Sequence, residues 1–227
     1  MTNDAHQGTF SIEKRTNMTE TPAVIFGFGG LARELWGWIR NGGNAALRAR
    51  VQAFVIDAEP SVNRYDAVPV LTRAKAIERG PMEYLLAVSD PAARRRISAE
   101  LDAAGWTAGQ YIHESTVIGV NLSIGKGTLV FPRCSLSSDA TIGEHVLVNG
   151  GTAIGHDCVI GSYTSLLGGV SVNGGVIVGE SVLVGAGAII HPGRKIGDGA
   201  IVGMGSVVFR DVEAGQTVYG NPAKRLS

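Results

Sequence analysis

The sequence has little cysteine and no excess of either charge. Twenty basic residues balance twenty acidic residues, and no basic cluster of the kind that marks a nucleic-acid-binding surface stands out. The two cysteines provide neither a disulfide framework nor a C-x-x-C metal motif. The histidines and carboxylates do not cluster as zinc or octahedral metal sites require. We therefore expect no nucleic-acid partner, no metal and a cytoplasmic location, since structural disulfides belong mainly to oxidising compartments.

Long uninterrupted apolar runs are also missing. Residues 1–21 are polar and lack the apolar core of a signal peptide, so they are expected to form a disordered lead-in. The most apolar stretch, residues 166–190, contains seven glycines together with Asn173 and Glu180. It is a poor candidate for a lipid-embedded helix. No association with a membrane is expected.

Glycine, in contrast, is abundant, and it belongs to a repeat. The chain contains 32 glycines in 227 residues, about twice the usual share. Every sixth residue from Ile112 to Val208 is isoleucine, leucine or valine, at 17 positions without exception. The residue after this aliphatic is often glycine, and the fourth residue after it is often small. Cys134 and Cys158 fall in this small slot, so we interpret both as buried packing residues.

A period of six fits neither an α-helix nor a simple alternating strand. It predicts a triangular solenoid in which a short strand forms each side and one aliphatic side chain per strand points inward. The small slot would keep the interior narrow, and glycine would tolerate the backbone angles of the corners. Three hexads make a coil of 18 residues, and no long loop is expected to leave the solenoid.

The N-terminal part of the chain alternates strands and helices instead. Strands are predicted at residues 23–28, 51–57 and 84–90, and helices at residues 31–41 and 91–105. This order is typical of a small parallel α/β sheet. The predicted fold is therefore a Rossmann-like α/β domain followed by an all-β solenoid. The α/β domain and the last residues of the chain are candidates to cap the two solenoid ends.

A glycine-rich turn, Gly27–Gly30, joins the first strand to the first helix. Such a turn lets a phosphate approach backbone N–H groups at a helix N-terminus. Asp57, at the end of the second strand, could bind a ribose or a base edge. A tight turn without a ligand stays an alternative, because Arg33 stands where the last glycine of the dinucleotide motif would fall. Arg33 and the run Arg94–Arg96 are interpreted as solvated charges on helix faces.

Together these features resemble the bacterial nucleotide-sugar acetyltransferases with a left-handed parallel β-helix. That group includes amino-sugar N-acetyltransferases and sialic acid O-acetyltransferases. The resemblance is carried by the Gly27–Gly30 turn, by VNGGTAIGHDCVIG at residues 148–161 and by YGNPAKR at residues 219–225. Two departures are Leu31, where the family usually has a histidine near the phosphates, and Ser165, where some relatives have another histidine.

The resemblance implies a domain organisation and partners. It implies acetyl-CoA as co-substrate, a nucleotide-sugar substrate and a homotrimer with active sites between subunits. The corresponding division of the chain is a lead-in (1–21), a nucleotide-sugar-binding α/β domain (22–110), a left-handed β-helix (111–213) and a CoA-contacting tail (214–227).

The resemblance also assigns roles to residues. His156 matches the catalytic base, Asp157 would orient it, and Asn149 would face the same pocket. Adjacent strand residues point to opposite faces, so Asp157 can serve His156 only if a corner reorients it. The candidate nucleotide-sugar ligands are Gly27, Phe28, Gly29, Gly30, Asp57 and Ser89. The candidate acetyl-CoA ligands are Ser165, Gly174, Gly187, Gly205, Pro222 and Lys224.

The chemistry required of such a site is simple. Acetyl transfer needs a base for the nucleophile, donors for the tetrahedral oxyanion and a means of holding both substrates together. A neutral imidazole can accept the proton, and backbone N–H groups can stabilise the oxyanion. The favoured function is direct transfer to the amino group of a nucleotide-linked amino-deoxy sugar, with His156 as general base. O-acetylation of a sialic acid or another glycan hydroxyl, and a non-catalytic β-helix binding module, stay as alternatives.

Overall fold

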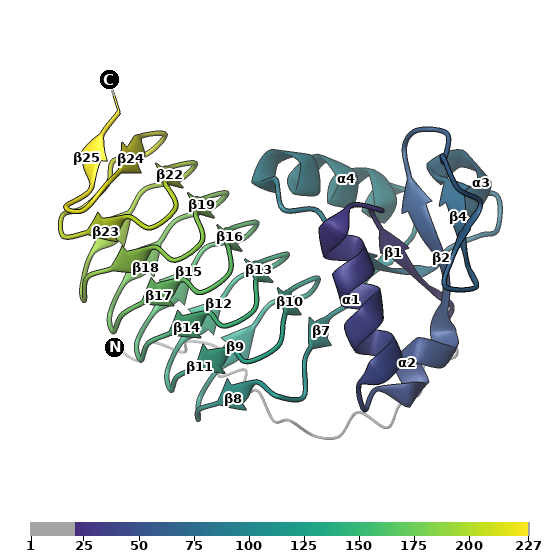
Figure 1. Ribbon diagram of the computed structural model, residues 1–227, viewed down its shortest axis with the longest axis horizontal. Coiled ribbons are helices and arrows are strands. Elements are labelled where there is room, and N and C mark those ends of the chain that lie inside the picture. The colour runs from purple at the N-terminus through teal and green to yellow at the C-terminus, as the bar shows by residue number, and fades with distance from the viewer. Residues whose placement is uncertain (1–20, 227) are drawn as a thin grey trace, which may run out of the picture.

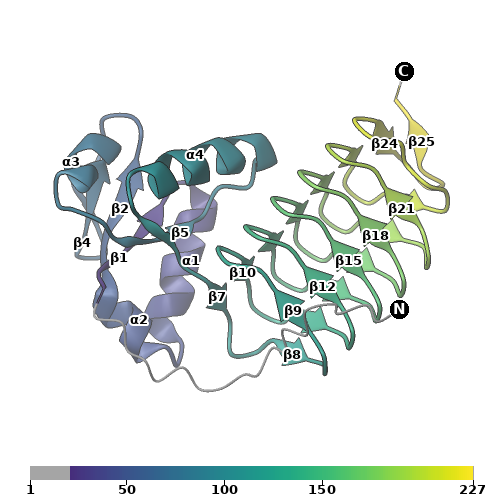
Figure 2. The same ribbon diagram turned by 180° about the vertical axis from the view of Figure 1, so that it is seen from behind.

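The computed structural model describes residues 21–226, which form an α/β domain beside a left-handed β-helix (Figures 1 and 2). The predicted fold class is thereby confirmed. None of the described helices is long and apolar enough to cross a membrane. The lead-in predicted over residues 1–21 lies almost wholly outside the described residues.

The α/β domain contains more elements than were predicted. Its elements are β1 (Ala23–Phe26), α1 (Gly30–Asn41), α2 (Ala45–Arg50), β2 (Val51–Ile56), β3 (Arg64–Tyr65), β4 (Val68–Thr72), α3 (Arg73–Ile77), β5 (Glu83–Leu86), α4 (Pro91–Ala103) and β6 (Thr107–Ala108). The strand order is β3-β4-β2-β1-β5-β6, and all pairs are parallel except the β3–β4 hairpin. The two predicted helices and three predicted strands are present, although β1 and β5 end earlier than expected.

Two apolar layers flank this sheet. Side chains of α1 and α2 pack on one face with residues of the β-helix, and side chains of α3 and α4 pack on the other face. Helix α4 begins where Asp90 Oδ1 accepts a hydrogen bond from the Ala93 N–H (2.6 Å), and Pro91 occupies its first turn. Helix α1 begins at Gly30, and its N-cap residue Gly29 has no side chain that could cap it. Its first N–H groups are therefore not covered by a capping side chain.

The β-helix follows the six-residue period throughout. Its strands are β7 (Tyr111–Ile112), β8 (Val117–Ile118), β9 (Ser123–Ile124), β10 (Leu129–Val130), β11 (Ser135–Leu136), β12 (Thr141–Ile142), β13 (Leu147–Val148), β14 (Ala153–Ile154), β15 (Val159–Ile160), β16 (Ser165–Leu166), β17 (Ser171–Val172), β18 (Ile177–Val178), β19 (Leu183–Val184), β20 (Ile189–Ile190), β21 (Lys195–Ile196), β22 (Ile201–Val202), β23 (Val207–Val208), β24 (Thr217–Tyr219) and β25 (Lys224–Arg225). Parallel pairs such as Leu129 with Leu147 confirm a coil of 18 residues.

The prism has three faces, which we name by their relation to the α/β domain. The covered face contains β7, β10, β13, β16, β19 and β22, extended by β24 and β25. The second face contains β8, β11, β14, β17, β20 and β23, and the third face contains β9, β12, β15, β18 and β21. Outward residues of the covered face such as Leu129 and Leu147 are buried beneath α1, and Trp38 of α1 lies 4.6 Å from Phe131 between ring centroids.

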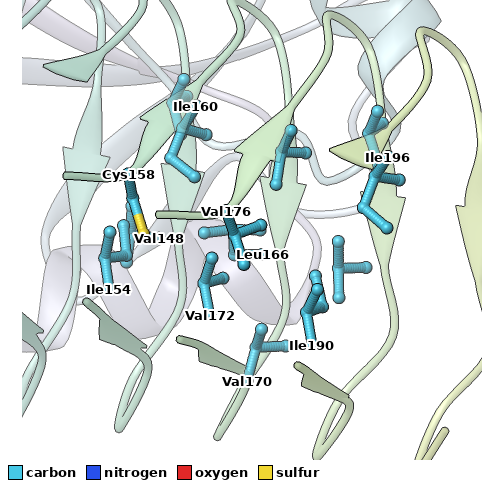
Figure 3. Close-up of a cluster of buried hydrophobic side chains, with 14 of the residues drawn as sticks. Val148, Ile154, Cys158, Ile160, Leu166, Val170, Val172, Val176, Ile190 and Ile196 are labelled. Atoms are coloured by element: carbon cyan, nitrogen blue, oxygen red, sulfur yellow. The ribbon is translucent and has the colours of Figure 1, made fainter. Parts of the chain in front are cut away.

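The prism interior is filled as the repeat predicts (Figure 3). Aliphatic residues such as Ile154 and Leu166 are buried. Both cysteines occupy the small slot and are buried, and burial raises the pKa of their thiols. Small-slot residues also hold the corners. Thr164 Oγ1 donates to the Gly179 carbonyl (2.8 Å), and Cys158 Sγ contacts the Asn173 carbonyl (3.1 Å).

The corner glycines have two roles, one of which was predicted. The left-handed backbone angle falls mainly on the third residue after the aliphatic, as at His145 (φ 53°) and Tyr163 (φ 63°). The glycine directly after the aliphatic is needed for close approach between coils. A Cβ atom at Gly155 would lie 2.6 Å from the Gly174 nitrogen. The expectation that glycine accommodates the corner angles is confirmed at the third position, where glycines such as Gly175 (φ 69°) and Gly187 (φ 70°) are left-handed.

The two ends of the β-helix differ. At the C-terminal end, Val218 is buried and Ala223 packs on the prism core, so the tail caps this end as expected. The α/β domain lies along the covered face (Figure 1) rather than over the first coil. The inward residues Ile112 and Ile118 of that coil are only partly buried, unlike the inward residues of the later coils. The prediction that the α/β domain caps this end is wrong.

Candidate active site

His156 lies at the corner between the second and third faces, directly after β14. The imidazole is exposed, and its Nδ1 lies 2.7 Å from Asp157 Oδ2. Asp157 adopts a left-handed backbone conformation (φ 57°), which turns its carboxylate towards the preceding ring. The corner thus supplies the reorientation that this pair requires. With Nδ1–H donated to the carboxylate, the lone pair of Nε2 is free to accept a proton.

Gly174 lies one coil further along the same corner and makes room for the imidazole. A Cβ atom at Gly174 would lie 2.5 Å from His156 Nε2. The ring therefore rests against bare backbone, and a group that reaches Nε2 also reaches the Gly174 peptide. Within residues 21–226, the Gly174 N–H makes no hydrogen bond. This arrangement places a proton acceptor beside a free backbone donor.

Asn149 is not beside His156 in one chain. It follows β13 at the corner between the covered and second faces, whereas His156 follows β14 at the next corner. The second face separates the two side chains. Gly187 and Gly205 occupy the same corner as Asn149, two and three coils further along, and Gly174 shares the corner of His156. The predicted catalytic residues and three of the predicted CoA residues, Gly174, Gly187 and Gly205, therefore fall on two corners that flank the second face.

The predicted nucleotide-sugar residues gather at the carboxyl edge of the α/β sheet. Gly27 has φ 112° and donates to the Val55 carbonyl (2.8 Å), and a Cβ atom there would lie 2.9 Å from the Ala87 oxygen. Phe28, Gly29 and Gly30 lead from this turn into α1, while Asp57 follows β2 and Ser89 follows β5. Because β2, β1 and β5 are adjacent and parallel, these residues share one edge.

Side chains around this edge are already paired. The Asp57 carboxylate forms an ion pair with Arg73. The ring of Phe28 makes an edge contact with Tyr65 (5.8 Å between centroids), and the Arg33 guanidinium lies 6.0 Å from the Phe28 ring centre. Arg33 is exposed, as its interpretation as a solvated charge requires.

Ser165 does not line an exposed groove. It is fully buried on the covered face, where its Oγ donates to the Ser89 carbonyl (2.7 Å) and accepts from Arg94 Nη1 (2.9 Å). The assignment of Ser165 to acetyl-CoA is corrected accordingly, because the α/β domain covers it. The remaining candidates, Pro222 and Lys224, are exposed in the tail beyond β24.

Two buried polar residues escaped the sequence reasoning. Arg94 is 1% exposed rather than solvated, because α4 lies against the β-helix. His145 is fully buried between the rings of Tyr84 and Tyr163, at 6.0 and 5.1 Å between centroids. Its place three residues after an aliphatic marks a corner, but only the docked domain buries that corner. Among the described residues, no group of histidine, cysteine, aspartate and glutamate could hold a metal ion.

Comparison with known proteins adds to this geometry. Residues 175–210 match the family described as bacterial transferase hexapeptide (six repeats). No curated protein sequence matches the chain. Among solved structures, WeeI from Acinetobacter baumannii AYE is similar, with 30% identity, a TM-score of 0.84 and coverage of 90% of this chain and 99% of WeeI.

Two further structures come from Caulobacter crescentus. PerB, in complex with CoA and GDP-perosamine, is 31% identical with a TM-score of 0.81, over 91% of this chain and 97% of PerB. A GDP-perosamine N-acetyltransferase with one histidine replaced by alanine, also in complex with CoA and GDP-perosamine, is 28% identical with a TM-score of 0.76. The match covers 91% of this chain and 97% of that one.

Proposed function

The chain belongs to the left-handed β-helix acetyltransferases with hexapeptide repeats, and we propose that its acceptor is the amino group of a nucleotide-linked amino-deoxy sugar. It is an acyltransferase that uses acetyl-CoA. The observation that carries the proposal is the His156–Asp157 pair beside Gly174, on a chain whose relative binds CoA and GDP-perosamine. The glycine turn at the edge of the α/β sheet supports a nucleotide as part of the acceptor.

In the proposed reaction the acetyl group moves directly from sulfur to nitrogen. The amine lone pair attacks the thioester carbonyl while His156 Nε2 takes the amine proton. Asp157 holds the imidazole with Nδ1 protonated and stabilises the imidazolium that forms. The Gly174 N–H donates to the tetrahedral oxyanion. When the C–S bond breaks, the CoA sulfur leaves with the electron pair and receives the proton from His156.

The separation of Asn149 from His156 supports an active site shared by two copies of the chain. If the second–third corner of one copy faces the covered–second corner of another, His156 and Gly174 meet Asn149, Gly187 and Gly205 of the partner copy. A closed ring of three prisms repeats this contact at each interface. The proposed assembly is therefore a homotrimer with three clefts. CoA occupies each cleft and extends towards the C-terminal coils, where Pro222 and Lys224 contact it.

An acceptor screen tests the function. The purified protein is incubated with acetyl-CoA and UDP-, dTDP- or GDP-linked 4-amino sugars, GDP-perosamine first, and released CoA thiol is measured. We expect turnover with one nucleotide class and an N-acetylated product by mass spectrometry. A free sialic acid in the same screen tests the hydroxyl acceptor. Turnover with sialic acid and with no nucleotide sugar would contradict the proposal, as would full activity of His156→Ala.

A further inference from the structure

Arg94 is a cation buried in the junction between the α/β domain and the β-helix. It lies in the second turn of α4, and Figure 2 shows this helix beside the coils. Its side chain is 1% exposed, and burial lowers the pKa of the guanidinium to about 10. Within residues 21–226, no ion pair includes Arg94. A buried charge without a counter-ion is costly, so the contacts that replace solvent indicate what this residue does.

All five guanidinium N–H groups have acceptors. Towards the β-helix, Nε donates to the His145 carbonyl (2.8 Å) and Nη2 to the carbonyls of Tyr163 (2.5 Å) and Thr164 (3.1 Å). Towards the α/β domain, Nη1 donates to the Val88 carbonyl (2.7 Å). It also donates to Ser165 Oγ. The rigid planar fork thus joins the corner between the third and covered faces to the segment that follows β5.

Ser165 makes a second tie to the same segment. Its hydroxyl donates to the Ser89 carbonyl (2.7 Å), so two consecutive carbonyls, Val88 and Ser89, are held by groups at this junction. This segment adjoins the glycine turn, since the Ala87 N–H donates to the Phe26 carbonyl (2.9 Å). Tyr163, Thr164 and Ser165 belong to the coil that carries His156, one short strand further along the chain.

Apolar contacts already hold the two domains together. Leu129, Leu147 and Phe131 of the β-helix form one core with α1. An apolar residue at position 94 would add to that adhesion without the cost of burying a charge. The guanidinium instead fixes the relative position of the two domains. Its five N–H groups have fixed directions, so they can all be satisfied in only one placement of the segment after β5 on the coils.

We propose that Arg94 is a positioning residue that sets the nucleotide-sugar-binding edge of the α/β domain in fixed register with the β-helix that carries His156. The inference rests on the proposed function, since the edge has this role only if the acceptor is a nucleotide sugar. In the proposed site acetyl-CoA contacts only β-helix and tail residues, so its binding does not depend on this register. Loss of the fork should therefore weaken productive binding of the acceptor and leave the donor unaffected.

The test compares Arg94→Lys with Ser165→Ala and with Arg79→Lys as a control for an exposed arginine. Lysine keeps the charge but loses the fork. With the best acceptor from the screen, we expect Arg94→Lys to raise the KM for that acceptor about tenfold and to change the KM for acetyl-CoA less than about twofold. Ser165→Ala should show a smaller shift of the same kind, and Arg79→Lys none. Hydrogen exchange should become faster at residues 87–90 and stay unchanged in the β-helix.

The alternative results separate the two proposals. Equal changes for both substrates, or an unchanged acceptor KM with unchanged exchange at residues 87–90, would overturn the positioning role while the function stands. Failure of the unmodified enzyme to acetylate any nucleotide sugar would overturn the function and this role together. If Arg94→Lys does not fold, Ser165→Ala decides, since it removes one hydroxyl and leaves the guanidinium in place.

Discussion

His156 Nε2 lies so close to Gly174 that a Cβ atom added to this glycine would be only 2.5 Å from the ring nitrogen. The atom that would clash belongs to the tip of an exposed side chain rather than to the backbone. An added methyl group can therefore be accommodated by a swing of the imidazole. The position of the imidazole, rather than the fold, depends on this glycine.

We accordingly predict that Gly174→Ala leaves the protein folded but lowers kcat about 100-fold, because His156 Nε2 moves away from the sugar amine that it should deprotonate. Steady-state kinetics and thermal unfolding measure the two effects. Gly161→Ala provides the contrast, since its Cβ would lie 2.4 Å from the backbone carbon of Gly179. That variant should lose thermal stability. Wild-type activity in a folded Gly174→Ala protein would refute the assigned place of the base.

The His156–Asp157 pair should matter for rate and little for stability. Both side chains are largely exposed, so their ion pair contributes little to folding. We expect His156→Ala to lower kcat about 10²–10⁴-fold. Asp157→Asn should lower it roughly tenfold, because asparagine tolerates the left-handed backbone but does not stabilise the imidazolium by charge. Neither variant should shift the melting temperature. Asp157→Asn with unchanged kcat would show that the carboxylate plays no part in catalysis.

Two inactive variants should restore activity when they assemble together. In the proposed trimer each cleft takes His156 from one copy and Asn149 from the next. Co-expression of His156→Ala with Asn149→Ala, each carrying a different tag, would give mixed trimers in which about a third of the clefts are intact, because one of the three interfaces in each mixed ring keeps both native residues. We expect tandem-purified mixed oligomers to show activity on that order and either pure variant to show much less. Mixed oligomers no more active than the pure variants, or a monomeric wild type by light scattering, would argue against the shared site.

Acid should destabilise the junction through His145. Its ring is fully buried, and neither ring nitrogen has a hydrogen-bond partner within the described chain. Burial lowers the pKa of His145 to about 4, whereas an unfolded histidine titrates near 6.5. Between these values the unfolded state binds more protons. The stabilising contribution is therefore complete above about pH 6.5 and is lost as the pH falls towards 4, with about 2 kcal/mol lost at pH 5.

Replacement of this ring isolates the effect. His145→Phe keeps an aromatic ring between Tyr84 and Tyr163 and removes the titrating group. The backbone angle accepts an aromatic residue, since Tyr163 takes φ 63° in the equivalent place one coil later. Urea unfolding near pH 7.5 and near pH 5 should show a smaller loss of free energy of unfolding for the variant than for wild type. Equal losses in the two proteins would exclude His145 as the source.

The β-helix could be predicted almost completely from the six-residue period. One aliphatic side chain per strand must fill a narrow interior, so the positions of residues such as Ile154 and Leu166 in the sequence locate the strands. The α/β domain was predicted less fully. Its long apolar segments were recognisable, but β3, β6 and the short helices α2 and α3 span too few residues to show a period of their own.

The candidate site divides in the same way. The local motif around His156 was recognisable because the pair with Asp157 is made within one corner. The partition of Asn149 and His156 between two corners follows from their hexad positions, but whether they meet in one pocket could not be predicted, because a full side of the prism separates them within one chain. Sequence likewise could not separate Arg94 from its neighbour Arg96, since both read as charges on one helix.

The local sequence pattern therefore specified the period, the inward residues and the histidine–carboxylate pair. All of these depend on neighbours within a few residues along the chain. The burial of Arg94, Ser165 and His145 depends on the docking of one domain on one face of the other. Residue pairs such as Arg94 and Ser165 are 71 positions apart, and contacts at that separation arise only from tertiary packing. The register between the proposed nucleotide-sugar-binding edge and the coil that carries His156 is a property of the folded molecule for that reason.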